Sequence, residues 1–375
     1  MIELSPDECE RCQDLTKKLL AITLQDCEEL GLDTTCDGAH AKLDKRRWKK
    51  LQSQRDVTVY ADRNADSAWL PVMRQNDWES PIAVIGVGRM ECSLEDVLFS
   101  LLTPNSASQR LRSFLMNRRP DKNCQLVPIV SPTQEAPLQS LAISRFVNVQ
   151  NWPFTIFQSP KEMVVVFATG EITALNGKRC GYEMVQSVTL QSQSQRAQMP
   201  QSRALQARIF WEQPDGSIGV YNKFVVDAKY RLSDSVKQLM LCRVVMGFWK
   251  YVPRSLETKK LWWCVKNKKE LINNLRTYSI SKDEESKSCE KKVQISDDKP
   301  HARNRCEFCE TGLCGGSKCR VSCQFTMYLS SDTGFLEQTL MLCLRCAAFV
   351  RSQNSGAIAR ATLEDLEQSS FGSAP

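Results

Sequence analysis

The sequence predicts an α+β protein in which a curved antiparallel sheet packs around a long C-terminal helix, followed by a small metal-binding module. Three observations indicate this fold. Strand-like segments joined by turns recur from residue 57 to residue 227. A long apolar helical segment follows them. Seven of the 17 cysteines then lie between Cys306 and Cys346.

The composition is that of a globular protein. The chain has 375 residues, of which 42% are apolar and 25% charged, with a net charge of +7, and this length fits one large domain and a smaller unit. The acidic N-terminus lacks the apolar run of a signal peptide, so we expect a cytoplasmic protein, peripheral to a membrane at most. No nucleophile–base pair or pair of carboxylates stands out, so we expect no enzymatic activity.

The first 49 residues are expected to form a helix and a basic lead-in. Ser5 and Glu8 form a capping box, and Pro6 suits the first helical position. The run from Lys45 to Lys50 is interpreted as a solvated approach to the first strand of the main domain.

Residues 50–278 are expected to form that main domain. A helical region that begins at Ser93 interrupts the strands, and Pro214-Asp215-Gly216-Ser217 predicts a hairpin. Strands that follow one another through turns favour an antiparallel sheet. The strand-like segments are 57–61, 82–90, 125–131, 141–149, 163–168, 183–190, 205–212 and 218–227.

The helical segment after the sheet is apolar on more than one face, with a second helix expected after Pro253. Leu241, Val245 and Trp249 are among its apolar side chains. A helix that is apolar over so wide an arc needs a cover. The concave face of the preceding sheet is expected to supply it.

The order of these elements resembles the START family of lipid-binding domains over roughly residues 50–278. The resemblance rests on Ser159 to Val165, on Gly181 to Val188, and on Val225 to Lys229 before the helix from Ser233. It implies a helix-grip fold whose tunnel, between sheet and helix, holds one hydrophobic ligand. The side chains expected to line it, unless they fill a solid core, are Val236, Met240, Val244 and Phe248.

The cysteine cluster predicts a zinc module over residues 303–352. Cys306–Cys309 and Cys343–Cys346 are two CxxC pairs, and four such thiolates can complete a tetrahedron around one ion. Residues 279–302 are charged and poor in large apolar side chains, so they are expected to be a linker. Residues 353–375 are expected to be a flexible tail.

The module resembles a degenerate FYVE-type finger, and four ligands that share one ion in that family match Cys306, Cys309, Cys343 and Cys346. No upstream CxxC completes a second site, for which Cys314, Cys319 and Cys323 remain weak candidates. The family's basic motif appears as Arg303 to Glu307 without its histidines, so headgroup-specific phosphoinositide binding is not expected.

These features together predict a protein that binds a lipid or other hydrophobic molecule. Transfer of that molecule is a further possible function. The zinc module would then dock to a membrane surface or a protein partner. The alternative is a protein–protein adaptor without a lipid ligand. Nucleic acid is not an expected partner, because Glu307, Glu310 and Asp332 dilute the basic residues around the finger.

Overall fold

The computed structural model describes residues 3–31, 43–63, 78, 81–117, 124–148, 161–173, 177–190, 203–227, 233–278, 305–311, 313, 320–329 and 334–371. Its strands are β1 (Trp48–Gln54), β2 (Val57–Asp62), β3 (Pro81–Met90), β4 (Gln125–Val130), β5 (Ser140–Asn148), β6 (Lys161–Thr173), β7 (Arg179–Ser187), β8 (Ala204–Glu212), β9 (Ile218–Asp227), β10 (Arg320–Leu329) and β11 (Gly334–Cys343). Its helices are α1 (Pro6–Glu29), α3 (Leu94–Leu101), α4 (Ser106–Asn117), α5 (Asp234–Lys266), α6 (Lys268–Thr277), α8 (Leu344–Ser352) and α9 (Ser355–Phe371).

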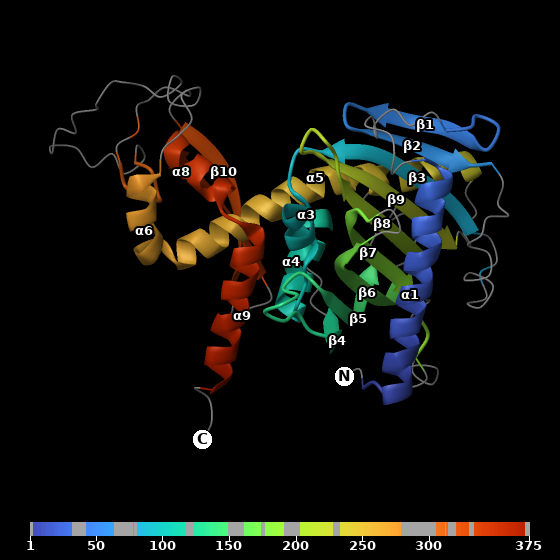
Figure 1. Cartoon of the computed structure of the whole chain (residues 1–375), viewed down its shortest axis with the longest axis horizontal. Helices are drawn as coiled ribbons and strands as arrows, with labels where there is room; N and C mark the ends of the chain where they lie inside the picture. The colour runs from blue at the N-terminus through green and yellow to red at the C-terminus, as the bar shows by residue number, and fades with distance from the viewer. Residues whose placement is uncertain are drawn as a thin grey trace.

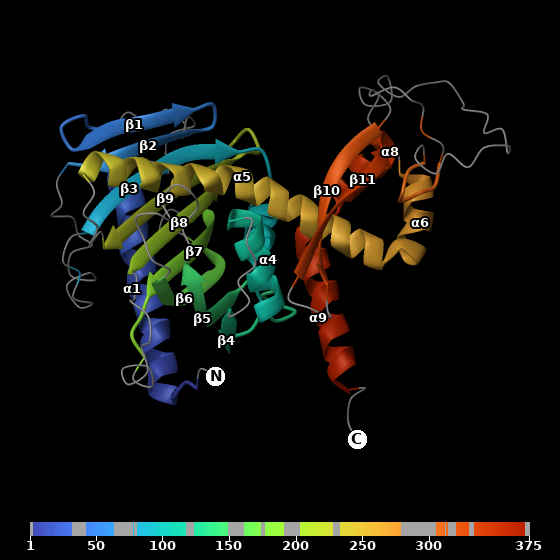
Figure 2. The ribbon, with the colours of Figure 1, turned by 180° about the vertical axis from the view of Figure 1, so that it is seen from behind.

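One antiparallel sheet of nine strands lies at the centre of the protein, in the order β1-β2-β3-β9-β8-β7-β6-β5-β4. The long helix α5 crosses one face and α1 covers the opposite face, as the front and back views show (Figures 1 and 2). The expected α+β helix-grip architecture, with a small cysteine-rich unit after it, is therefore confirmed.

The two faces of the sheet follow from the alternation of side chains along each strand. On β8, Ile209 packs into the core beneath α1, whereas Phe210 stacks on Phe248 of α5 with ring centroids 6.0 Å apart. On β3, Gly86 lies directly beneath α5, where an added Cβ would stand only 2.4 Å from Val245 Cγ1. A residue without a side chain at this position therefore lets α5 approach the sheet.

Several helices and strands were predicted correctly from short sequence patterns. Ser5 and Glu8 form the predicted capping box, in which Glu8 N donates to Ser5 Oγ at 3.2 Å and Ser5 N donates to Glu8 Oε2 at 3.0 Å. β8 and β9 form the predicted hairpin, whose turn contains Gly216 with a φ of +82°. Each of the eight strand-like segments corresponds to one strand between β2 and β9.

The basic lead-in is a strand rather than an approach to one. β1 starts at Trp48, which is buried, while Lys49 and Lys50 are exposed. Lysines on an edge strand discourage pairing with another chain. The run of basic residues lacks the usual alternation of a strand, because only Trp48 and Leu51 have apolar side chains that face the cores. The sequence pattern therefore did not predict β1.

The long helix continues through Pro253 instead of restarting after it. Proline removes one helical hydrogen bond, but tertiary bonds hold the helix on both sides of it. Tyr251 Oη and Ser255 Oγ donate to the carbonyl oxygen of Ser100 in α3, at 3.2 and 2.8 Å. One continuous helix therefore connects the large sheet with the C-terminal unit.

The C-terminal unit packs on the second half of α5 and on α6. Its core contains Leu261 and Cys264 of α5 together with Leu342 and Phe349. The expected linker 279–302 lies outside the described residues. A boundary after residue 278 consequently does not separate two independent cores, because α5 contributes to both.

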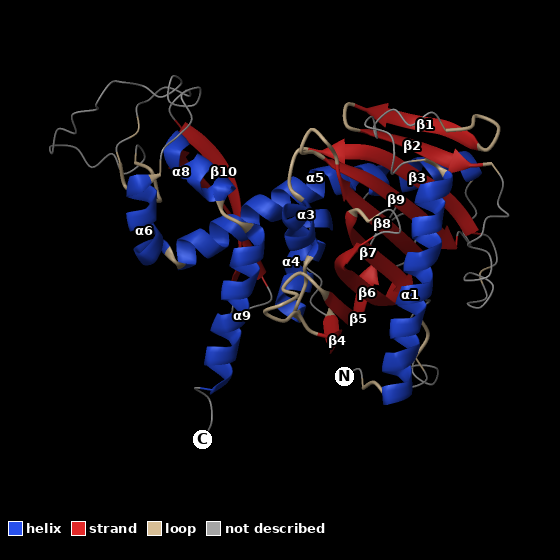
Figure 3. Ribbon diagram, viewed as in Figure 1, coloured by secondary structure: helices blue, strands red, loops and turns tan. Residues whose placement is uncertain are grey.

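The segment expected to be a flexible tail contains α9, drawn as a helix near α3 in Figure 3. Ile358 and Ala359 are buried in the core formed by α3 and α5. Ser355 Oγ donates to Asp96 Oδ1 at 2.5 Å. The sequence prediction was wrong because a short amphipathic helix is stabilised by the surface it packs on rather than by its own sequence.

Replacing Ile358 with aspartate is expected to destabilise the protein by about 3 kcal/mol or more, because it removes a buried side chain and buries a charge. The neighbouring Ala357 is exposed, so Ala357→Asp serves as the matched control and should change the unfolding free energy by less than about 0.5 kcal/mol. Urea unfolding of both variants measures the difference. Equal, small effects would show that α9 does not pack on the main unit.

Within the described part of the chain, no helix combines the length and the apolar character that crossing a membrane requires.

Candidate functional site

Two groups of side chains stand out as candidate sites, and the first is a cluster of four cysteines. The Sγ atoms of Cys306, Cys309, Cys343 and Cys346 all lie within 4.8 Å of one another. Cys306 and Cys346 are completely buried. The two CxxC pairs, 34 residues apart in the sequence, are therefore brought together by the fold as their spacing predicted.

Each pair is positioned by a tight backbone structure. In the first pair, Glu310 N donates to the carbonyl oxygen of Cys306 at 2.8 Å, and Cys306 N donates to that of Thr311 at 2.9 Å. This turn holds Glu310 at a φ of +64°, a conformation that glycine adopts more readily. Lys268 Nζ of α6 pairs with the Glu310 carboxylate at 2.9 Å.

The second pair lies where β11 ends and α8 begins. Cys343 is the N-cap of α8, and its Sγ accepts a hydrogen bond from Cys346 N at 3.3 Å. The N-terminus of a helix stabilises negative charge, and the hydrogen bond from Cys346 N acts to lower the pKa of Cys343. The side-chain hydrogen bonds with Cys306 and Cys309 nevertheless raise the pKa of Cys343 overall.

The geometry of the cluster fits a tetrahedral ion. Zinc–sulfur bonds of about 2.3 Å place two ligand sulfurs roughly 3.8 Å apart in a tetrahedron, and Cys309 Sγ lies 3.8 Å from Cys343 Sγ. Hydrogen bonds within the cluster lower the pKa of Cys309 and raise the pKa of Cys346. In both cases the hydrogen bond with Cys306 has the largest effect. The four sulfurs can therefore hold a metal ion once their remaining protons are released.

Of the candidates for a second metal site, the structure describes only Cys323, which is not part of this cluster. Cys323 is buried among apolar side chains, and burial raises its pKa to about 12, which disfavours the thiolate. Cys314 and Cys319 lie outside the described residues. The second site remains a prediction from the sequence.

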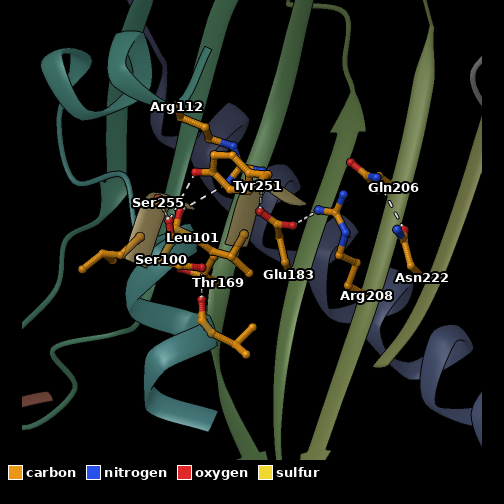
Figure 4. A network of polar contacts seen from close by, with 12 residues as sticks. Ser100, Leu101, Arg112, Thr169, Glu183, Gln206, Arg208, Asn222, Tyr251 and Ser255 are labelled. Carbon is orange, nitrogen blue, oxygen red and sulfur yellow. Dashed lines mark hydrogen bonds and ion pairs between the residues drawn. The ribbon is translucent and has the colours of Figure 1, made fainter. Parts of the chain in front are cut away.

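The second candidate site is a buried polar network on the face of the sheet that α5 crosses (Figure 4). Glu183 of β7 lies between two arginines: Oε1 pairs with Arg112 Nη2 at 2.7 Å, and Oε2 accepts a hydrogen bond from Arg208 Nη1. Neither Glu183 nor Arg208 exposes any of its side chain. Charged groups are almost never buried to this extent unless they have a partner.

Aromatic rings and backbone carbonyls hold the two arginines in place. Arg112 donates from Nη1 to the carbonyl oxygen of Leu101 at 3.2 Å and lies 4.5 Å from the centroid of Phe167. Arg208 lies 4.1 Å from the centroid of Phe248. The groups that position the two guanidinium groups thus come from α3, β6 and α5.

Positive charge exceeds negative charge around this network. Burial lowers the pKa of both Arg112 and Arg208. Burial, followed by the charge of Arg112, lowers the pKa of Lys259 to about 7, although Lys259 Nζ donates to three carbonyl oxygens near the C-terminal end of α3, at 2.7 to 3.0 Å. Additional negative charge would therefore be stabilised here.

Several donors of the network have no acceptor among the described residues. They are Nε and Nη2 of Arg208 and Nδ2 of Asn222. Asn222 lies opposite Arg208 in the β8–β9 register, and its Oδ1 accepts a hydrogen bond from Gln206 Nε2 at 3.4 Å. Because a buried donor without a partner is costly, such groups require water or a ligand.

The four side chains expected to line the ligand tunnel do not share one environment. Phe248 is buried against the sheet, at 1% exposure, whereas Val236 and Val244 expose 40% and 43% of their surface. Met240 is half-buried. A spacing of four residues cannot establish which side of a helix faces the sheet; here Leu241, Val245 and Phe248 form the inner side.

The sequence prediction did not include Arg112, Glu183 or Arg208. A usable signal existed in the strands, because Glu183 and Arg208 interrupt otherwise apolar segments at positions that alternation places on an inner face. Nothing in the sequence pairs them with each other or with α4, which contributes Arg112.

No known protein-family model matches the sequence, and no curated protein matches it. Solved structures similar to this chain include human StAR-related lipid transfer protein 5, at 12% identity and a TM-score of 0.43, covering 65% of this chain and 97% of that one. Human STARD10 is 12% identical, with a TM-score of 0.38 and coverages of 61% and 79%. A STAR-related lipid transfer protein from Xanthomonas axonopodis is 14% identical, with a TM-score of 0.36 and coverages of 56% and 98%. Likeness of this size leaves the function undecided.

Proposed function

We propose that this chain binds one lipid or other hydrophobic molecule between the large sheet and α5, without catalysing a reaction. The observation that carries the proposal is the buried polar network around Glu183, which lies on the face that also carries Phe167 and Phe210 and retains donors without acceptors among the described residues. A ligand with an apolar body and a polar end would satisfy both kinds of surface.

Native mass spectrometry of the purified protein tests this proposal directly, since a bound lipid adds a discrete mass that organic extraction removes. A transfer assay with fluorescent lipid between two vesicle populations separates binding from transfer. A protein that carries no lipid and takes none up would favour the alternative, an adaptor that binds only proteins.

Filling the region beside the network is expected to reduce lipid uptake. Gln206 is buried on the α5-facing side of β8 and makes one long hydrogen bond, to Asn222. Gln206→Trp should therefore lower uptake at least tenfold if a ligand occupies this region. A dense core would instead lose about 1–3 kcal/mol of stability on overpacking. Uptake and melting temperature are measured on the same samples.

Val244→Trp is the matched control, because it adds the same ring on the exposed side of α5. The sequence predicts that Val244 lines the tunnel. Because Val244 is exposed in the structure, uptake should stay unchanged. Lower uptake in the Val244 variant, with normal uptake in the Gln206 variant, would place the ligand elsewhere.

We further propose that zinc is the metal held by Cys306, Cys309, Cys343 and Cys346, because four thiolates in tetrahedral array suit this ion. The ion would stabilise the C-terminal unit as a docking module for a membrane surface or a protein partner, with the whole protein in the cytoplasm. Whether the module is a FYVE-type finger stays a prediction from the sequence.

A further inference from the structure

The buried network contains more fixed positive charge than its one carboxylate neutralises. Glu183 uses both oxygens, one for Arg112 and one for Arg208. The network therefore keeps one positive charge that no carboxylate within it balances. Removal from water makes such a charge costly, and an opposite charge brought close to it reduces that cost.

The donors of Arg208 that have no acceptor among the described residues share a specific geometry. Its Nη1 is used by Glu183, whereas Nε and Nη2 have no acceptor among the described residues. Nε and Nη2 form one edge of the planar guanidinium group, and two parallel N–H bonds from such an edge match the two oxygens of a carboxylate or phosphate.

Two neighbours of Arg208 supply no acceptor oxygen to this edge. The Phe248 ring, whose centroid is 4.1 Å from Arg208 Cζ, makes a cation–π contact and supplies no oxygen. Asn222, opposite Arg208 on the next strand, contributes an Nδ2 donor that likewise has no acceptor among the described residues. Its Oδ1 is bonded to Gln206. The buried groups of Arg208 and Asn222 that have no partner among the described residues are therefore all donors.

We propose that the polar end of the ligand is an anionic group, a carboxylate or a phosphate monoester, bound by the Nε–Nη2 edge of Arg208 with Asn222 Nδ2 as a third donor. The inference rests on the ligand site proposed above and adds the class of ligand. Neutral headgroups satisfy the donors but leave the positive charge unbalanced. Cationic headgroups do neither.

Matched probes test the proposal on the full-length protein. The first pair is a fluorescent long-chain fatty acid and its methyl ester, and the second is a fluorescent alkyl phosphate monoester and its dimethyl ester. Each pair shares one chain and differs in charge. The anion of at least one pair should bind at least tenfold more tightly than its ester, and the pair with the larger ratio identifies carboxylate or phosphate as the preferred group.

Arg208→Lys provides the second measurement, because lysine keeps the positive charge but lacks the two-donor edge. The preference for anion over ester should fall at least fivefold in this variant. Lys237→Arg, on the part of α5 before the network, should leave the preference unchanged.

Three results would overturn the proposal. In the first, acid and ester bind the unmodified protein equally, which would show that ordered water satisfies the donors; this outcome needs no variant and holds even if Arg208→Lys fails to fold. In the second, a folded Arg208→Lys variant keeps the full preference. In the third, no probe binds at all, which would refute the proposed lipid-binding function as well.

Discussion

Replacing Cys343 with serine is expected to release the metal and unfold the unit formed by α6, β10, β11 and α8. Structural zinc contributes an apparent 10–16 kcal/mol in small modules, and three thiolates hold the ion poorly. Cys343 also caps α8, but serine is a favourable N-cap residue, so the substitution removes a metal ligand while keeping the helix cap. Metal analysis and hydrogen exchange measure the two effects.

Cys323→Ser is the matched control for this prediction. Cys323 is buried in the same core but lies outside the four-cysteine cluster, so its substitution should leave the metal content unchanged and cost only a small amount of packing. The backbone amides of the sheet and of the first half of α5 should remain protected from hydrogen exchange in both variants. The C-terminal unit could stay protected from hydrogen exchange without metal, or both variants could lose metal equally. Either result would show that the ligands are assigned wrongly.

Replacing Glu183 with glutamine is expected to destabilise the large domain by about 3–5 kcal/mol. The substitution keeps the shape of the side chain but leaves two buried guanidinium groups without a counter-charge, and breaking one partner of a buried ion pair has effects of this size. Urea unfolding followed by tryptophan fluorescence measures the change.

Two comparisons make the interpretation specific. Glu171→Gln removes a carboxylate that pairs with Arg179 at a partly exposed position, so it should cost less than about 1 kcal/mol. The triple variant Arg112→Met, Glu183→Leu and Arg208→Met removes all three charges and should recover most of the lost stability. It should also lose the anion preference. A triple variant as unstable as Glu183→Gln would mean that packing, rather than charge, dominates at this site.

The sequence by itself determined the features that depend on near neighbours in the chain. The capping box of α1, the hairpin turn at Gly216 and the alternation of the strands are set by residues a few positions apart. The two CxxC pairs belong to this group as well, since a metal requires two ligands from one short turn whatever the rest of the fold does. For these features the pattern and its physical cause lie in the same segment.

Only the tertiary structure decided the features that depend on contacts between distant segments. α5 passes through Pro253 because Ser100 of α3 accepts hydrogen bonds on both sides of it, and α9 is ordered because Ile358 finds a buried place against α3. Val244 and Val245 are adjacent and alike in sequence, yet one is exposed and the other buried. When a helix is apolar on all sides, its sequence does not determine which side faces the sheet. Likewise, Arg112, Glu183 and Arg208 form a charge network only when three separate elements meet.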